Sequence, residues 1–212
     1  MTPDDILKIF VEQHRLCSPL DPEADPYEEL TMNSTIDEWR NANDLLPWRP
    51  LSRFLNDEFK LSLTEEEWEC VLTPSHERTL YDVCSFISDR LSTSNIVPLK
   101  LFGQECLSAA IFSTLKKHLQ RRNVDVSELK PSSSVIPYLE KYFSAMIEQT
   151  TILSKGGKVF SSLIVKRKKK GFFNYINIFD KDRYTFLTGD VQTFKDLTKK
   201  IIEANNIIET VS

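Results

Sequence analysis

The stretch Ser-Thr-Ser-Asn-Ile-Val-Pro at residues 92–98 decides how this chain is divided. Small polar residues running into a proline are typical of a linker. The chain has 212 residues, which suits one large domain or two small ones. We therefore expect an acidic helical domain over residues 1–94 and a basic α+β domain over residues 95–212.

The two sides of this stretch carry opposite net charges. Residues 1–97 hold 8 Lys and Arg against 20 Asp and Glu, a net charge of −12. Residues 98–212 hold 19 Lys and Arg against 11 Asp and Glu, a net charge of +8. This asymmetry indicates separate units, and it favours either two halves that attract each other or a basic face that meets an anionic partner.

Apolar residues at helical spacing occupy most of the N-terminal part. The predicted helices cover residues 3–15, 34–39, 50–59, 64–72 and 80–91. Thr64-Glu65-Glu66-Glu67 is a capping box, and the three glutamates suit a solvated helix start better than an acid/base pair. The proline-rich, acidic segment between the first two helices is expected to be a loop.

The C-terminal part mixes helical and strand patterns. Helices are predicted at residues 103–120 and 137–149. Three β-rich runs follow at 159–166, 172–179 and 183–188, and their short links predict hairpins. Asp190 is expected to cap a closing helix. The predicted fold is therefore α+β: a helical bundle, then two helices, a three-stranded antiparallel sheet and a final helix.

The order of elements in residues 1–91 resembles that of acyl carrier proteins. Leu55-Asn56-Asp57-Glu58-Phe59 is similar to the end of the second helix of that family, and Thr79-Leu80-Tyr81-Asp82-Val83-Cys84-Ser85-Phe86-Ile87 is similar to its last helix. The resemblance implies a small acidic bundle whose phosphopantetheine-attachment motif falls at Asp44-Leu45-Leu46. Leucine stands where the family has its attachment serine, and it offers no nucleophilic oxygen.

That departure implies a carrier-like fold without the prosthetic group. Pro47 and Pro50 also fall inside what would be the second helix, so the helix is expected to start at Pro50. Ser34 is a conceivable displaced attachment site, but its position suits a helix cap. The alternative is a small acidic helical bundle unrelated to that family.

Residues capable of catalysis are few and scattered. Cys106 is the best candidate nucleophile, because it lies in the first turn of a predicted helix. His118 follows on that helix about 18 Å further along, so the two are not partners, and a packed apolar cysteine is the alternative reading. With His14 and His76 there is no metal-ligand spacing, and Gly156-Gly157 lacks the residues of a phosphate loop. We expect no enzyme activity, no cofactor and no metal.

The densest charge cluster is Lys166-Arg167-Lys168-Lys169-Lys170. Aromatic residues alternate along the neighbouring runs, which is the pattern that single-stranded nucleic acid needs for stacking and phosphate contact: Phe173, Tyr175, Phe179, Tyr184 and Phe186. A lysine-rich turn is also an ordinary hairpin tip, and aromatic side chains commonly pack a sheet against a helix. Docking of the basic half on the acidic half is a further alternative.

The compartment follows from the cysteines and from the apolar runs. Four cysteines show no paired spacing, no export signal is present, and no run approaches the roughly 20 apolar residues of a membrane-spanning helix. We expect a cytoplasmic location and no membrane contact. The leading hypothesis is a non-catalytic interaction or adaptor protein with a protein partner. The alternatives are a nucleic-acid-binding module using residues 166–170, and a degenerate acyl-carrier-like docking domain.

Overall fold

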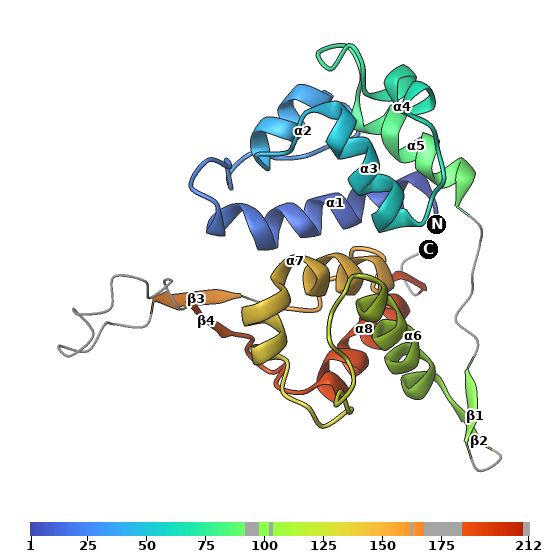
Figure 1. Ribbon diagram of the computed structural model, residues 1–212, viewed down its shortest axis with the longest axis vertical. Coiled ribbons are helices and arrows are strands. Elements are labelled where there is room, and N and C mark those ends of the chain that lie inside the picture. Colours follow the sequence, from blue (N-terminus) through green and yellow to red (C-terminus); the bar gives the residue numbers. More distant parts are fainter. Residues whose placement is uncertain (92–97, 102–103, 162, 168–183, 210–212) are drawn as a thin grey trace.

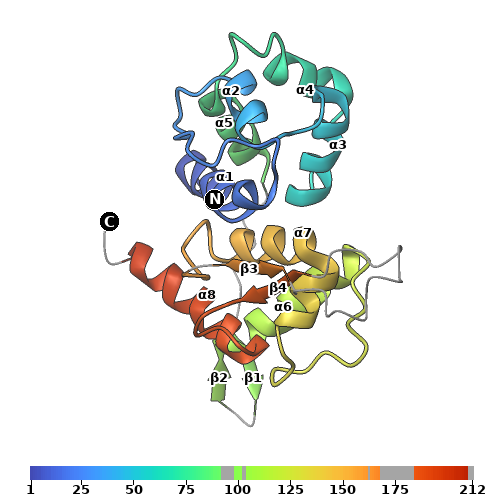
Figure 2. The same ribbon diagram turned by 90° about the vertical axis from the view of Figure 1, so that its left-hand side faces the viewer.

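The computed structural model describes residues 1–91, 98–101, 104–161, 163–167 and 184–209. In these ranges the chain forms eight α-helices, one 3-10 helix and two pairs of short strands. The helices gather in two groups, α1 to α5 and α6 to α8, and both side views place α1 and α7 along the boundary between them (Figures 1 and 2).

The N-terminal group is a set of short helices joined by ordered loops. Its elements are α1 Pro3–Cys17, the 3-10 helix Ser18–Leu20, α2 Ile36–Ala42, α3 Trp48–Phe59, α4 Glu65–Leu72 and α5 Leu80–Arg90. Thr2, Thr35 and Thr64 begin three of the helices with capping boxes, so the box predicted at Thr64 is confirmed. Each box satisfies backbone donors that a helix start leaves unpaired.

Three of the predicted helix starts are displaced. The helix predicted from residue 103 begins at Leu107, because Gln104–Cys106 form a short strand. α3 begins at Trp48 rather than at Pro50, and Pro50 lies in its first turn, where no backbone donor is needed. α8 is capped by Thr193 rather than by Asp190. The amide of Asp196 donates to Thr193 Oγ1 at 3.2 Å, and the Thr193 amide donates to Asp196 Oδ2 at 2.9 Å. Asp190 instead forms an ion pair with Lys200 at 2.8 Å.

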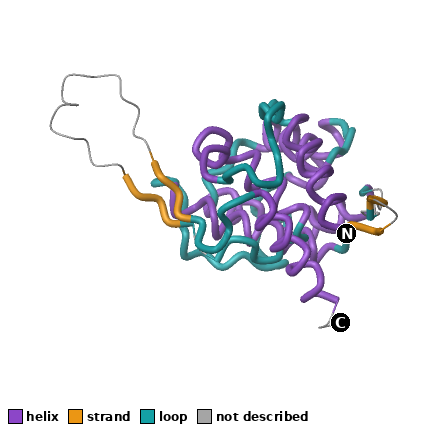
Figure 3. Tube along the Cα trace, turned by 90° about the horizontal axis from the view of Figure 1, so that it is seen from below, coloured by secondary structure: helices purple, strands orange, loops and turns teal. Residues whose placement is uncertain are grey.

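The C-terminal group is built on three longer helices. They are α6 Leu107–Arg121, α7 Ile136–Leu153 and α8 Phe194–Glu209. The strands are β1 Leu99–Leu101, β2 Gln104–Cys106, β3 Ile164–Arg167 and β4 Tyr184–Leu187. β1 pairs with β2 and β3 with β4, each antiparallel, and the two pairs project from opposite sides of the helical body (Figure 3).

The prediction of an α+β fold with a three-stranded antiparallel sheet is wrong. In the part of the chain that the structure describes, helices dominate, and each strand has one partner only. The expected middle strand at 172–179 lies outside the described residues. The physical reason is visible in Val159 and Phe160, which are buried against helices without any strand pairing. β-Branched and aromatic side chains suit any half-buried surface, and here helices provide it.

The buried apolar side chains form two clusters that interlock at the boundary. One cluster draws on residues 6–87 and the other on residues 111–204. Leu16 of α1 belongs to the second cluster, and Ile152 of α7 packs against the first. The boundary predicted after residue 94 lies outside the described residues and stays a prediction.

Gly156 brings the two groups into backbone contact. Its φ of +75° favours glycine, and a Cβ there would lie 2.2 Å from the carbonyl carbon of Lys8 in α1. The turn after α7 therefore rests directly on the first helix.

Candidate functional site

Hydrogen bonds cross the boundary near the C-terminal end of α1. The Arg15 guanidinium donates to the carbonyl oxygen of Phe160 at 2.7 Å, and Gln13 Nε2 donates to Thr151 Oγ1 at 3.1 Å. Among the described residues, every ion pair lies within one group of helices. The opposite net charges of the two halves therefore do not join them by ion pairing in this part of the chain.

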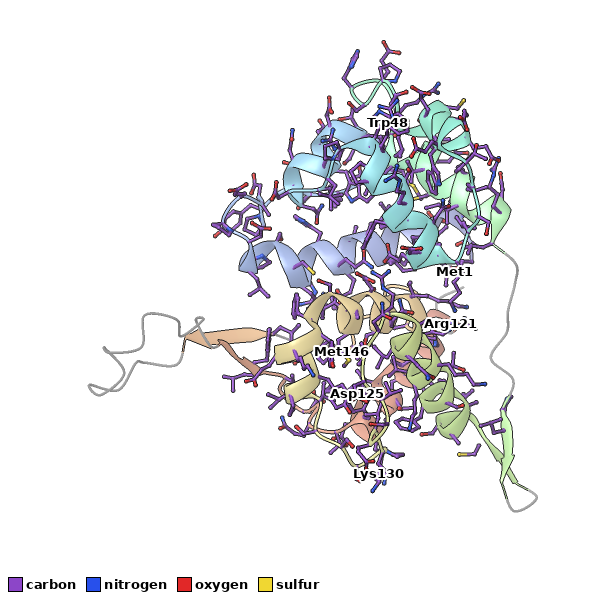
Figure 4. The ribbon with its side chains drawn as sticks, viewed as in Figure 1. Met1, Trp48, Arg121, Asp125, Lys130 and Met146 are labelled. Carbon is purple, nitrogen blue, oxygen red and sulfur yellow. The ribbon has the colours of Figure 1, made fainter. Side chains whose placement is uncertain are left out.

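A polar groove opens between the ends of α3 and α6, beside α7. Its volume is about 730 Å³. Three cations line it: Lys60 just after α3, Arg121 at the end of α6, and Arg122 immediately after α6. Asp57 is the one carboxylate among its lining residues. Figure 4 shows Arg121 at the end of α6 that faces the N-terminal helices.

The groove holds more positive charge than its own side chains neutralise. Burial, followed by Lys60 and Arg121, lowers the pKa of His118 to about 4, so the imidazole is neutral at pH 7. Lys60 Nζ lies 2.5 Å from His118 Nε2, where the neutral ring accepts a hydrogen bond from the ammonium group. Burial and Arg121 also lower the pKa of Lys60. An anion bound in the groove would raise both pKa values again, because it would stabilise the charged forms of His118 and Lys60.

A second, smaller cavity of about 190 Å³ lies between α1, α3 and α7. Its walls are mainly apolar: Phe10, Trp39, Leu45, Leu51, Phe54, Leu55 and Ile147. Glu58 of α3 and Glu148 of α7 form its acidic corner. Glu58 is 2% exposed and Glu148 is 5% exposed, which is unusual for carboxyl groups.

The two carboxyl groups are held differently. Gln13 Nε2 donates to Glu58 Oε1, while Arg122 Nη2 lies 2.8 Å from Glu148 Oε2. Burial, with a further contribution from Glu148, raises the pKa of Glu58 to about 8. Burial raises the pKa of Glu148 to about 7 despite the opposing effect of Arg122. Glu58 therefore carries a proton at pH 7, and Glu148 is poised near its midpoint.

The structure separates the candidate catalytic residues. The prediction that Cys106 lies in the first turn of a helix is wrong, because Cys106 ends β2 and directly precedes α6. His118 lies in the last turn of α6, so the two are not brought together. His14 is buried and contacts Asn43 Oδ1 and the Glu28 carbonyl, and His76 lies beside Glu77 on the surface. In the ranges described, no group of His, Cys, Asp and Glu side chains is arranged to hold a metal.

The residues tied to the carrier-protein resemblance have structural roles. Leu45 lines the apolar cavity, just after Asp44, whose φ is +47°. Ser34 Oγ accepts a hydrogen bond from the Thr31 amide at 2.9 Å, so its hydroxyl stabilises a turn before α2. The cap expected at Ser34 is instead formed by Thr35.

The basic cluster is described only in part. Lys166 and Arg167 belong to β3, opposite Thr185 and Tyr184 of β4, while Lys168, Lys169 and Lys170 lie outside the described residues, as do Phe173, Tyr175 and Phe179. Phe186 stacks on Phe143 at 5.2 Å between centroids and is 6% exposed. It therefore serves the core and is not available to stack on a base.

Comparison with known proteins adds no assignment, because no protein-family model, curated protein or solved structure matches the chain. No helix in the described ranges combines the length and the apolar character that crossing a membrane requires.

The two acidic residues of the cavity escaped the sequence analysis, although a signal was present. Glu58 falls on the apolar face of its helix, three residues after Leu55 and next to Phe59. Glu148 lies in a run of buried residues from Met146 to Thr151. A charged residue at a core position of a helical pattern indicates a buried ionisable group. What the pattern does not show is that the two glutamates meet.

Proposed function

We propose that the protein is a non-catalytic interaction protein of the cytoplasm that binds an acidic segment of a protein partner in the groove. The single observation that carries this proposal is the convergence of Lys60 and Arg121 on a groove with one lining carboxylate. Neither cation pairs with a carboxylate among the described residues. The two cations come from different halves, so the assembled chain is needed to present them together.

Two of the four cysteines are poorly suited to nucleophilic catalysis. Burial, with Glu148 and Glu58 contributing, raises the pKa of the Cys17 thiol to about 12. Burial also raises the pKa of the Cys84 thiol to about 12. Both thiols are therefore protonated at pH 7 and are poor nucleophiles. The four cysteines form no disulfides, which suits a reducing compartment.

The test uses fluorescence anisotropy with a labelled peptide containing four consecutive glutamates. A peptide with four glutamines and a single-stranded oligonucleotide serve as comparison ligands. We expect the glutamate peptide to bind in low salt and to weaken as salt is added. The double variant Lys60→Ala/Arg121→Ala should lose about two- to thirtyfold in affinity, since two exposed ion pairs together contribute about 0.4–2 kcal/mol.

A matched control removes the same charge elsewhere. Lys130→Ala/Lys195→Ala takes two exposed lysines from the far end of the C-terminal group, where Figure 4 labels Lys130. An equal loss in both double variants would contradict the proposal, as would equal binding of the glutamine peptide. Oligonucleotide binding that survives the groove variant, and that is lost on neutralising residues 166–170, would favour the nucleic-acid alternative instead.

A further inference from the structure

The acidic corner of the small cavity contains a buried oxygen without a partner. Glu58 Oε1 accepts the hydrogen bond from Gln13, but Glu58 Oε2 is buried and has no hydrogen-bond partner among the described residues. Buried carboxyl oxygens are nearly always paired, because leaving one unpaired costs about 1–3 kcal/mol. A ligand group that donates a hydrogen bond would remove this cost.

The charged groups around Glu58 leave one negative charge without a counter-ion when both glutamates are ionised. The groups that act on its carboxyl are Gln13 from α1, Glu148 from α7 and Arg122 after α6. Arg122 lies against Glu148, so Glu148 has its counter-ion. Cys17, also on α1, lines the cavity with a protonated thiol. When both glutamates are ionised, the corner therefore holds two negative charges and one positive charge.

The volume of the cavity limits the size of the apolar part of a ligand. A cavity of about 150 Å³ lined by apolar side chains is large enough for benzene. The present cavity is somewhat larger, at about 190 Å³, and three aromatic residues line it: Phe10, Trp39 and Phe54. A single ring or a branched alkyl group of that size fits beside the acidic corner.

We propose that this cavity binds a small organic ammonium ion, with its apolar body among Phe10, Trp39 and Ile147 and its ammonium group donating to Glu58 Oε2. The site uses none of the groove cations Lys60 and Arg121, so it stands independently of the proposed acidic-peptide site.

Binding releases a proton. Without a bound ammonium ion, the raised pKa of Glu58 keeps its carboxyl protonated at pH 7. When the ammonium ion enters, the O–H bond of Glu58 breaks, its proton passes to solvent, and the carboxylate pairs with the intact ammonium. Up to one proton is released per ligand, so the affinity rises with pH up to about pH 8 and levels off above it.

Isothermal titration calorimetry of the full chain with 2-phenylethylamine tests this proposal. Benzyl alcohol and phenylacetate provide similar bodies without charge and with the opposite charge. We expect the amine to bind, phenylacetate not to bind, and the alcohol to bind at least tenfold more weakly than the amine. The apparent enthalpy should differ between phosphate and Tris buffers at pH 7, because the released proton is taken up by the buffer.

Glu58→Gln is the main variant, because an amide is close in shape to the protonated carboxyl that it replaces. It should lose at least tenfold in amine affinity and abolish the buffer dependence, while the control Glu69→Gln on the surface of α4 should leave both unchanged. If Glu58→Gln does not fold, Leu45→Trp fills the cavity and keeps both carboxyls. It should weaken the amine and the alcohol together.

Several outcomes would overturn the proposal. They are no amine binding at millimolar concentration, equal affinity for amine and alcohol, and an enthalpy that does not depend on the buffer. Lys60→Ala/Arg121→Ala should bind the amine as the unmodified chain does. If the groove does not bind the acidic peptide, the amine can still bind in the cavity. If the cavity does not bind the amine, the groove can still bind the peptide.

Discussion

The groove and the small cavity lie between the same two groups of helices, yet their chemistry is opposite. The groove is open and is lined by Lys60, Arg121 and Arg122. The cavity is smaller, mainly apolar, and has Glu58 and Glu148 in one corner. Ser144 lines both. A single boundary between helices thus provides a site suited to anions next to a site suited to cations.

The ion pair between Arg122 and Glu148 separates the two sites. Arg122 lines the groove, and Glu148 lines the cavity. Arg122 also lies 5.8 Å from the ring centre of Phe54, a wall of the cavity. This ion pair neutralises one positive charge of the groove and one negative charge of the cavity. Lys60 and Arg121 remain as the cations of the groove, and Glu58 remains as the acidic group of the cavity.

The largest effect is expected at the boundary itself. Gly156→Ala places a methyl group against the backbone of α1 and strains a residue at φ +75°, so it should lower the free energy of unfolding by about 3 kcal/mol or more. Gly189→Ala is the matched control, since it also has positive φ but would meet only Ser161 Oγ at 3.1 Å. It should cost about 1–2 kcal/mol. Urea denaturation measures both, and equal losses would contradict the close contact.

The second-largest effect on stability is expected at the ion pair between Arg122 and Glu148. Arg122→Met leaves the buried Glu148 without its cation, and we expect a loss of about 2 kcal/mol at pH 8. The loss should shrink at pH 5.5. There Glu148, whose pKa is about 7, is protonated and has no charge to pair. Arg121→Met removes a neighbouring arginine that has no carboxylate partner in the described part of the chain. If Arg121→Met loses as much stability as Arg122→Met at both pH 8 and pH 5.5, the ion pair between Arg122 and Glu148 has no special role.

The acidic corner should make stability fall with increasing pH. A carboxyl whose pKa is raised to about 8 on folding binds more protons in the folded than in the unfolded state, so unfolding becomes easier as it titrates. The slope should reach up to about 1.4 kcal/mol per pH unit for each carboxyl between about pH 5 and its folded pKa, which is about 8 for Glu58 and about 7 for Glu148. Denaturation of Glu58→Gln, with Glu69→Gln as control, should show a flatter profile for the first variant only.

The smallest stability effect belongs to the groove. Arg121→Ala should change the free energy of unfolding by less than about 0.5 kcal/mol, because its side chain lies on the surface. It should nevertheless raise the pKa of His118, since Arg121 is one of the cations that lower it. An NMR titration of the His118 ring measures this shift. Lys130→Ala should leave the ring unchanged, and an unchanged ring in Arg121→Ala would mean that the groove cations do not interact.

Helix positions followed from the sequence to within a few residues, because local signals determine them. Thr64 begins α4 through its capping box, and the apolar spacing of Leu51 and Leu55 marks α3. The sheet did not follow, because strand patterns report burial rather than a pairing partner. Val159 and Phe160 satisfy that pattern by packing on helices.

The two sites depend on contacts that no local pattern contains. Lys60 and His118 are 58 residues apart in the chain, and Glu58 and Glu148 are 90 residues apart. From the sequence pattern, each of these residues is an ordinary member of a polar or apolar helix face. Its role becomes visible only when the two halves are placed together. The sequence showed the charge asymmetry, but it did not show that hydrogen bonds and apolar contacts, rather than acid–base pairs, join the halves in the described part of the chain.

The double role of α1 has a consequence for synthesis on the ribosome. This helix is made well before α7, yet the cluster that buries Leu16 and the Thr151 hydroxyl that Gln13 contacts are complete only when α7 has been made, more than 100 residues later. Until then the last turn of α1 presents an uncovered apolar edge to the cell. Completion of α7 both closes that edge and assembles the groove and the cavity, so a chain that stalls before residue 150 would have neither.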